Sequence, residues 1–294
     1  MQFSTMKSFQ LLSALFQSAL LVSALPIAKR EASVHAGKRI ILWDYTLTEA
    51  YQSNSNIQAS AAALTSSPGI SAALNWNTWK PSELPSDVPF QPMIRTPDQL
   101  SGDDWTNLIS VVSSGGESTI VHFYNEPDTT GVSASDAAAS FKSNVVPLRT
   151  QYGCKLVGPA VESNDAGTAW LQEFYSGLSS DEMPNYLGVH FYTAETTPAE
   201  TEVGNAKSYI SAEHSRYNLP VIVSEIGSTS RDADSVDTFT KEISAWLDSQ
   251  DWIHSYGFFG ATTTPVDGFV SPAAQLLDSA GSWTSLGNWW VSSQ

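Results

Sequence analysis

Cysteine and basic residues are scarce in this sequence. Cys154 is the single cysteine among 294 residues, so the chain forms neither an internal disulfide nor a zinc site made of several cysteines. Lysine and arginine number 14 against 30 aspartates and glutamates, which gives a formal net charge of −16 at pH 7. Because a surface this acidic repels phosphate backbones, the composition excludes nucleic acid as a partner.

Motifs that mark the commonest nucleotide-binding proteins and serine hydrolases are also missing. The sequence has no phosphate-binding loop and no Gly-x-Ser-x-Gly turn. No His-x-x-x-His pair or acidic cluster indicates a metal site, so we expect no metal and no cofactor. The apolar run over residues 9–22 is interrupted by Gln10 and Gln17 and is shorter than the roughly 20 residues of a membrane span. We therefore expect no membrane anchor. We also expect the protein to be a monomer.

The first residues instead have the pattern of a secretory signal peptide. Residues 1–24 contain a basic start, an apolar run and the small-residue cleavage site Val22-Ser23-Ala24. Lys29-Arg30 is typical of a dibasic processing site, so residues 25–37 are predicted to form a short leader. We expect a protein that is secreted, either extracellular or in a cell wall. Without its first 30 residues, which hold three basic groups and no acid, the net charge becomes −19.

The rest of the chain alternates between two kinds of segment. Eight short runs of β-forming residues recur, at residues 39–46, 72–77, 90–96, 119–126, 155–161, 186–193, 221–227 and 255–261. Most are followed by a helical pattern, clearest at residues 48–64, 99–112, 133–146, 167–178, 198–217 and 235–247. Residues 79–89 hold three prolines and are predicted to be a loop.

This alternation predicts an α/β fold made of β-α units, with a single domain over residues 38–294. Runs such as Ile40-Ile41-Leu42 are apolar throughout, as in parallel strands that are covered on both faces. Eight units fit a (β/α)₈ (TIM) barrel, which has about 250 residues. The alternative, an open doubly wound sheet, usually has a glycine-rich turn after its first strand, where this chain has Trp43-Asp44-Tyr45-Thr46.

Functional residues of such a barrel lie at the carboxyl ends of its strands. Glu126 ends the fourth run and Glu225 lies near the end of the seventh. A lone glutamate there is more often an ion pair or a helix cap, but glycoside hydrolysis needs a pair, one carboxyl protonated and the other ionised. Other strand ends offer side chains that could bind sugar rings and hydroxyls, namely Trp43, Tyr45, Asn75, Trp76, Asn125, His190, Tyr192 and Phe258, with Glu162 as a third carboxylate.

Several of these segments resemble one known family. Tyr124-Asn125-Glu126-Pro127 resembles the Asn-Glu-Pro motif of retaining barrel glycosidases, and Val223-Ser224-Glu225 resembles their nucleophile strand. The ordered series resembles glycoside hydrolase family 128, the alkali-sensitive-linkage-protein-like hydrolases. The matching pieces are Lys38-Arg39, Asn75-Trp76, Pro92-Met93-Ile94, residues 155–161, Trp170-Leu171 with Phe174, and Val189-His190-Phe191-Tyr192.

The resemblance implies a retaining β-1,3-glucan hydrolase, with Glu126 as acid/base and Glu225 as nucleophile. It also implies that Tyr192 hydrogen-bonds Glu225, that His190 lines the sugar site and that Phe258 stands near a tryptophan which the family often has in its last strand. The expected substrate is a β-1,3-glucan polysaccharide or oligosaccharide, and an endo-acting enzyme is favoured. The alternatives are a β-1,3-glucan-binding wall protein with little or no catalysis, and a glycosidase for another β-glucan linkage.

Overall fold

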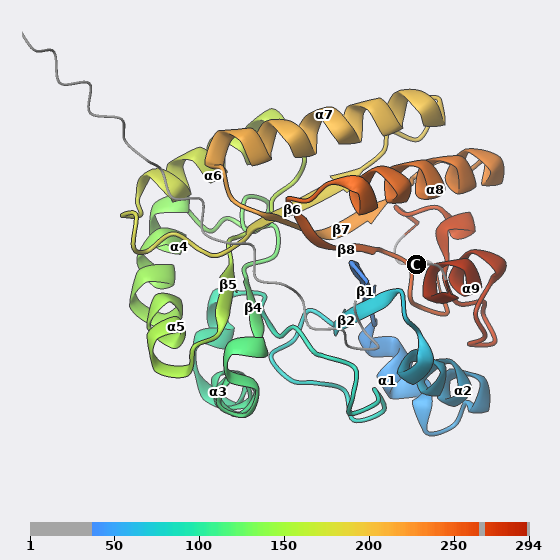
Figure 1. Ribbon diagram of the computed structural model, residues 1–294, viewed down its shortest axis with the longest axis horizontal. Coiled ribbons are helices and arrows are strands. Elements are labelled where there is room, and N and C mark those ends of the chain that lie inside the picture. The colour runs from blue at the N-terminus through green and yellow to red at the C-terminus, as the bar shows by residue number, and fades with distance from the viewer. Residues whose placement is uncertain (1–36, 265–267, 293–294) are drawn as a thin grey trace, which may run out of the picture. The chain divides into compact units, whose positions relative to one another are not determined.

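Parallel strands form the centre of the computed structural model, which describes residues 37–264 and 268–292 (Figure 1). In order they are β1 (Arg39–Leu42), β2 (Ile70–Leu74), β3 (Met93–Ile94), β4 (Ile120–Phe123), β5 (Lys155–Val157), β6 (Leu187–Tyr192), β7 (Val221–Gly227) and β8 (Ile253–Phe258). Strands β2, β1, β8, β7 and β6 are hydrogen-bonded in that order, and β3, β4 and β5 form a second set.

Two isolated parallel bridges join the two sets of strands. Ala73 of β2 pairs with Phe90, just before β3, and Val157 of β5 pairs with Tyr186, just before β6. With these bridges each strand lies beside its neighbours in the sequence, and β8 lies beside β1. This is the strand order of a (β/α)₈ barrel, so the predicted α/β barrel fold is confirmed.

Helices lie outside the strands and connect them (Figure 1). Their bounds are α1 (Tyr45–Tyr51), α2 (Ser55–Ala63), α3 (Gly102–Gly115), α4 (Ala134–Ser140), α5 (Val146–Tyr152), α6 (Asp165–Ser176), α7 (Ala199–Tyr217), α8 (Ala233–Ser249) and α9 (Ser285–Ser292). Within the described residues, no helix is both long and apolar enough to cross a membrane. The predicted signal peptide, residues 1–24, lies outside the described residues, and secretion stays a prediction.

Two helical predictions differ from the structure in their bounds. The pattern over residues 48–64 forms two helices because Asn54 begins a new one, its side chain accepting from the N–H groups of Asn56 and Ile57. The segment predicted to end at residue 146 continues to Tyr152 through a π-helical turn, Phe141–Val145, which lies just before Pro147. The predicted loop between β2 and β3 is confirmed, since Trp79–Pro89 contains neither a helix nor a strand.

Alternate residues of several strands enter two different cores. Ile40 and Leu42 of β1 join Leu74, Met93, Ile120, Val157 and Ile222 in the cluster that fills the interior of the barrel. Ile41 and Trp43 join the larger cluster between strands and helices. Each fully buried aliphatic side chain contributes roughly 1.5–3 kcal/mol to folding. Side chains alternate between the two faces of a strand, and this alternation decides which of them can reach a site inside the barrel.

Two tryptophans of α9 cover the outer side of β1 and β8, where Trp290 packs against Tyr256 and Phe258. The guanidinium of Arg39, at the start of β1, lies 4.6 Å from the ring centroid of Trp289 and 4.7 Å from that of Trp290. Its Nη1 also donates to the Trp290 carbonyl at 3.0 Å. The helix that carries these tryptophans, α9, was not among the helical patterns identified in the sequence.

Candidate active site

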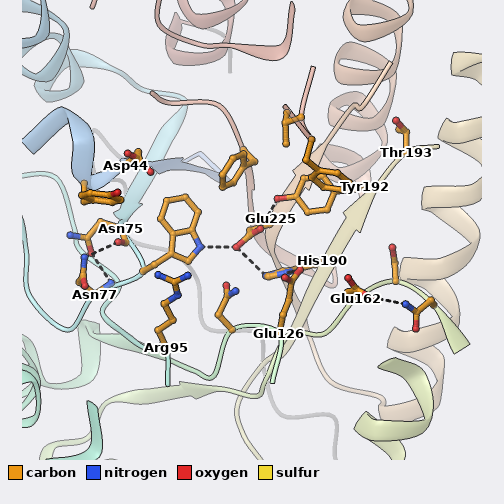
Figure 2. A pocket seen from close by; sticks show the side chains of 18 of the residues that line it. Asp44, Asn75, Asn77, Arg95, Glu126, Glu162, His190, Tyr192, Thr193 and Glu225 are labelled. Carbon is orange, nitrogen blue, oxygen red and sulfur yellow. Dashed lines mark hydrogen bonds and ion pairs between the residues drawn. The ribbon is translucent and has the colours of Figure 1, made fainter. Parts of the chain in front are cut away.

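A pocket of about 830 Å³ opens where the strands end (Figure 2). Residues that follow or end nearly every strand line it: Asp44, Tyr45, Asn75, Trp76, Asn77, Trp79, Arg95, Asn125, Glu126, Glu162, Ser163, Asn164, His190, Tyr192, Thr193, Glu225, Phe259, Phe269 and Val270. A volume of this size is typical of a small-molecule site. The structure thus brings nine of the eleven predicted site residues together.

Left-handed backbone conformations are concentrated at this pocket. Trp76, Tyr124 and Glu126 have φ angles of 57°, 46° and 45°. Such a conformation costs roughly 1–3 kcal/mol in a residue other than glycine and must be held by its surroundings. Here the N–H of Tyr124 donates to Ile94 O at 2.7 Å, and that of Glu126 donates to Ala160 O at 2.8 Å. The neighbouring strand ends therefore fix the direction in which Glu126 leaves β4.

Glu225 lies within β7, and both oxygens of its buried carboxylate accept a hydrogen bond. Trp76 donates its indole N–H to Oε1 at 2.6 Å, and Tyr192 donates its hydroxyl to Oε2 at 2.5 Å. An ionised carboxylate fits this position because it only accepts hydrogen bonds. The predicted contact between Tyr192 and Glu225 is confirmed. The contact with Trp76 gives that residue a second role beside the predicted one of lining the pocket.

His190 lies between the two carboxylates and is itself only 1% exposed. Its Nδ1 is 2.9 Å from Glu126 Oε1, and its Nε2 is 3.6 Å from Glu225 Oε1. Burial lowers the pKa of His190, but the charges of Glu225 and Glu126 and the hydrogen bond to Glu126 outweigh it, so the pKa is raised above 6.5. The imidazole therefore holds a proton between two negative groups.

The pKa of Glu126 shifts in the opposite direction. Burial raises this pKa, yet the hydrogen bond and charge of His190, together with the charge of Arg95, lower it overall. Glu126 and His190 thus share one proton that in the free protein resides mainly on the imidazole. Together they form a pair that can deliver a proton into the pocket, where the Glu126 side chain is 27% exposed.

The same three side chains also have the composition of a metal site. One ligand atom from each of Glu126, His190 and Glu225 lies within 4.8 Å of the others. However, the imidazole nitrogen nearest Glu126 is taken up by a hydrogen bond, and so are both oxygens of Glu225. A raised pKa at His190 also disfavours the neutral imidazole that a metal needs. These residues fit proton transfer better than metal binding.

The other predicted residues found at the pocket differ in how free they are to bind a ligand. Both ends of the Asn75 amide are used by its own loop, since Nδ2 donates to Trp79 O at 3.2 Å and Oδ1 accepts from Asn77 N at 3.1 Å. Tyr45 is 55% exposed at the rim, and Glu162 is exposed there too. Asn125 has a buried Oδ1 without a partner among the described residues, which suits a ligand hydroxyl.

Two predicted site residues, Trp43 and Phe258, do not reach the pocket, and these predictions were wrong. Trp43 is fully buried among the helices, and its indole N–H donates to Glu83 at 3.0 Å. Phe258 packs edge-on against Trp290, with ring centroids 5.1 Å apart. Both predictions were wrong for the same reason. Each residue belongs to the outward-facing set of its strand, whereas the next residue, Asp44 or Phe259, faces the pocket.

Sequence reasoning missed several residues that line the pocket. Phe259 contacts Trp76, with centroids 5.4 Å apart, and could have been identified from the alternation of Tyr256 and Phe258. Phe269 lies in the long connection after β8, where no periodic signal exists. Trp79 also lines the pocket, and its position depends on the course of the loop between β2 and β3.

A parallel barrel with paired carboxylates at its strand ends defines a class of protein, the barrel glycosyl hydrolases. Consistent with this, residues 48–290 match the family model described as glycosyl hydrolase catalytic core. No curated protein sequence matches the chain.

Solved structures define the family further. An exo-β-1,3-glucanase of glycoside hydrolase family 128 (subgroup VI) from Aureobasidium namibiae is 33% identical, with a TM-score of 0.79 over 89% of this chain and 98% of that one. A subgroup V exo-β-1,3-glucanase from Cryptococcus neoformans is 28% identical, with a TM-score of 0.68 over 87% and 98%. A subgroup IV endo-β-1,3-glucanase from Lentinula edodes, 22% identical with a TM-score of 0.69 over 86% and 99%, shares the fold. The chain belongs to glycoside hydrolase family 128.

Proposed function

We propose that the chain is a retaining hydrolase of β-1,3-glucan. The observation that carries this proposal is the spacing of the carboxylates, because one oxygen of Glu126 lies within 4.8 Å of one oxygen of Glu225. Retaining glycosidases place their carboxyl groups about 5–5.5 Å apart, whereas inverting enzymes separate them by about 6.5–9.5 Å to admit a water molecule. The short spacing supports direct attack by a carboxylate.

The two glutamates take different roles in this proposal. Glu225 attacks the anomeric carbon while the Glu126–His190 pair gives its proton to the departing glycosidic oxygen, so the C–O bond breaks as the glycosyl ester forms. Glu126 then removes a proton from water, which attacks the same carbon and frees Glu225. The hydrogen bonds from Trp76 and Tyr192 keep Glu225 aimed at that carbon. Asn125 is placed to bind a sugar hydroxyl beside Glu126.

The substrate class rests on the relatives. The structures 33% and 28% identical to this chain are both described as exo-β-1,3-glucanases, and the endo-acting enzyme from Lentinula edodes is more distant at 22%. We therefore place exo cleavage first and keep the endo mode, which the sequence analysis favoured, as the second candidate. Exposed aromatic side chains along the pocket suit the flat C–H faces of glucosyl rings.

Product analysis tests this proposal and separates the modes. The purified protein is incubated with laminarin, and the products are sized over time. One short product from the earliest times indicates exo cleavage, and a ladder of sizes indicates endo cleavage. Cello-oligosaccharides of equal length test the linkage. Absence of any product from laminarin, with laminarin still bound, would favour the glucan-binding alternative and contradict hydrolysis.

The pH dependence of hydrolysis follows from the shared proton. Because the pKa of His190 is raised above 6.5, the pair keeps its proton below that pH and loses it as the pH rises through the raised value. We expect the alkaline decline of kcat/KM for laminari-oligosaccharides to begin above about pH 6.5. In His190→Asn the decline should move to lower pH. His214→Asn, on α7 and outside the pocket, is the control; an unchanged profile in His190→Asn would contradict the shared proton.

A further inference from the structure

Phe269 is one of two large apolar side chains that are strongly exposed among the described residues, and it stands at the mouth of the pocket. It is 52% exposed. It lies in the connection between β8 and α9, and its ring meets Tyr192 edge-on, with centroids 5.0 Å apart at 64°. Tyr192 in turn donates to Glu225. One ring contact thus separates Phe269 from the carboxylate at the reaction centre.

The backbone around Phe269 is held so that the ring stays at the mouth. The guanidinium of Arg231 donates to the carbonyls of Gly268, Phe269 and Val270. Arg231 itself pairs with Glu195 at 3.6 Å. Ser271, which follows Val270, donates its N–H to Ser228 O at 2.9 Å, and this hydrogen bond ties the segment to the end of β7. A ligand that covers an apolar ring held in solvent in this way removes apolar surface from water, which favours binding.

The position of Phe269 relative to the two glutamates assigns it to one side of the scissile bond. Tyr192 and Phe269 lie beside Glu225, which attacks the sugar that keeps the anomeric carbon. The loop with Glu162 lies beside Glu126, since Glu126 N donates to Ala160 O at 2.8 Å and Glu162 N donates to Asp128 at 3.3 Å. Glu126 protonates the leaving oxygen in the proposed mechanism. The Phe269 side is therefore the non-reducing side of the bond, the glycone side.

We propose that Phe269 is the platform for the second glucosyl residue on the glycone side, next to the residue that Glu225 attacks. This inference rests on the proposed function. It gives Phe269 a specificity-determining role, because a chain with only one residue on the glycone side cannot cover the ring. The initial product from the non-reducing side is then a disaccharide or longer, and glucose is not the main product.

Laminaripentaose labelled at its reducing end tests the proposal, since the length of the labelled product reports where cleavage falls. The wild-type protein should leave two or more unlabelled residues in the glycone product. In Phe269→Ala, KM should rise about twofold to tenfold, the loss expected for one aromatic contact. The labelled product should also become longer, because cleavage moves toward the non-reducing end. Phe269→Tyr should restore the wild-type pattern, while Phe269→Leu, which has no ring, should not.

The outcomes separate this inference from the proposed function. A wild-type protein that releases nothing from laminari-oligosaccharides contradicts the proposed function itself. An active wild type whose KM and cleavage pattern are unchanged in Phe269→Ala contradicts the platform alone. A shorter labelled product in Phe269→Ala would place Phe269 on the reducing side and also contradict the inference. Thermal unfolding of each variant shows whether a change comes from lost folding instead.

Discussion

Glu225→Gln is expected to lose hydrolysis of laminari-oligosaccharides by on the order of 10⁴-fold or more while it still binds them. The amide is nearly the same size as the carboxylate but has no negative charge with which to attack the anomeric carbon. Its carbonyl oxygen can still accept from Tyr192 or from Trp76, so the pocket should keep its shape. Binding measured by calorimetry with laminaritriose should change little, and kcat should fall nearly to zero.

Glu162→Gln is the matched control for this experiment. Glu162 lines the same pocket, but it lies exposed at the rim and its side chain accepts from Asn164 at 2.9 Å. The same change of charge there should cost at most about tenfold, as for an exposed polar contact. If the two variants lose activity equally, the effect comes from the charge of the pocket as a whole. Substantial turnover by Glu225→Gln would remove Glu225 as the nucleophile.

Much of this arrangement could be predicted because it depends on local patterns. Apolar runs at regular spacing indicate parallel strands, and the carboxyl ends of such strands meet at one end of a barrel. Glu126 and Glu225 are 99 positions apart, yet their places at strand ends predicted that they would meet. The contact between Tyr192 and Glu225 follows from the resemblance to the family and from the pairing of β6 with β7.

The incorrect predictions at Trp43 and Phe258 come from a shift of one residue. A strand end tells which residues are near the site, whereas only the alternation tells which of them face it. Ile40 and Leu42 face the interior of the barrel, so Trp43 must face the helices. The sequence contains this alternation, but it is hard to recognise there. A strand that is covered on both faces is apolar throughout, so no polar side distinguishes the inward-facing residues from the outward-facing ones.

Other features depend on long-range geometry that no local pattern records. The Trp76 indole meets Glu225 across 149 positions because a left-handed turn after β2 directs it inward. Likewise, Phe269 reaches the pocket because Arg231, in the segment between β7 and α8, donates to the backbone carbonyls of Phe269 and Val270. Contacts of this kind determine the charge state and shape of the site. They become visible only when the loops are placed relative to one another.

Glu126→Gln is expected to lose activity on laminari-oligosaccharides by about 10²–10⁴-fold, the range for a missing general acid. The loss should depend on the leaving group, because the amide cannot protonate a departing sugar. A 2,4-dinitrophenyl glycoside of laminaribiose needs no such proton, so its first step should stay fast in the variant. Hydrolysis of the glycosyl ester should then be slow, since no base activates water. A burst of dinitrophenol followed by slow turnover, seen by stopped-flow absorbance, checks this expectation.

Azide gives the same variant a stereochemical test, since it attacks the glycosyl ester without help from a base. In Glu126→Gln, azide should speed turnover and form the β-glycosyl azide, which has undergone two inversions. In Glu225→Gln no ester forms, so any azide product should have the α configuration from a single inversion. The anomeric configuration is read directly by proton NMR. An α product from Glu126→Gln would show that the roles of the two glutamates are exchanged, and the absence of rescue in both variants would contradict the covalent intermediate.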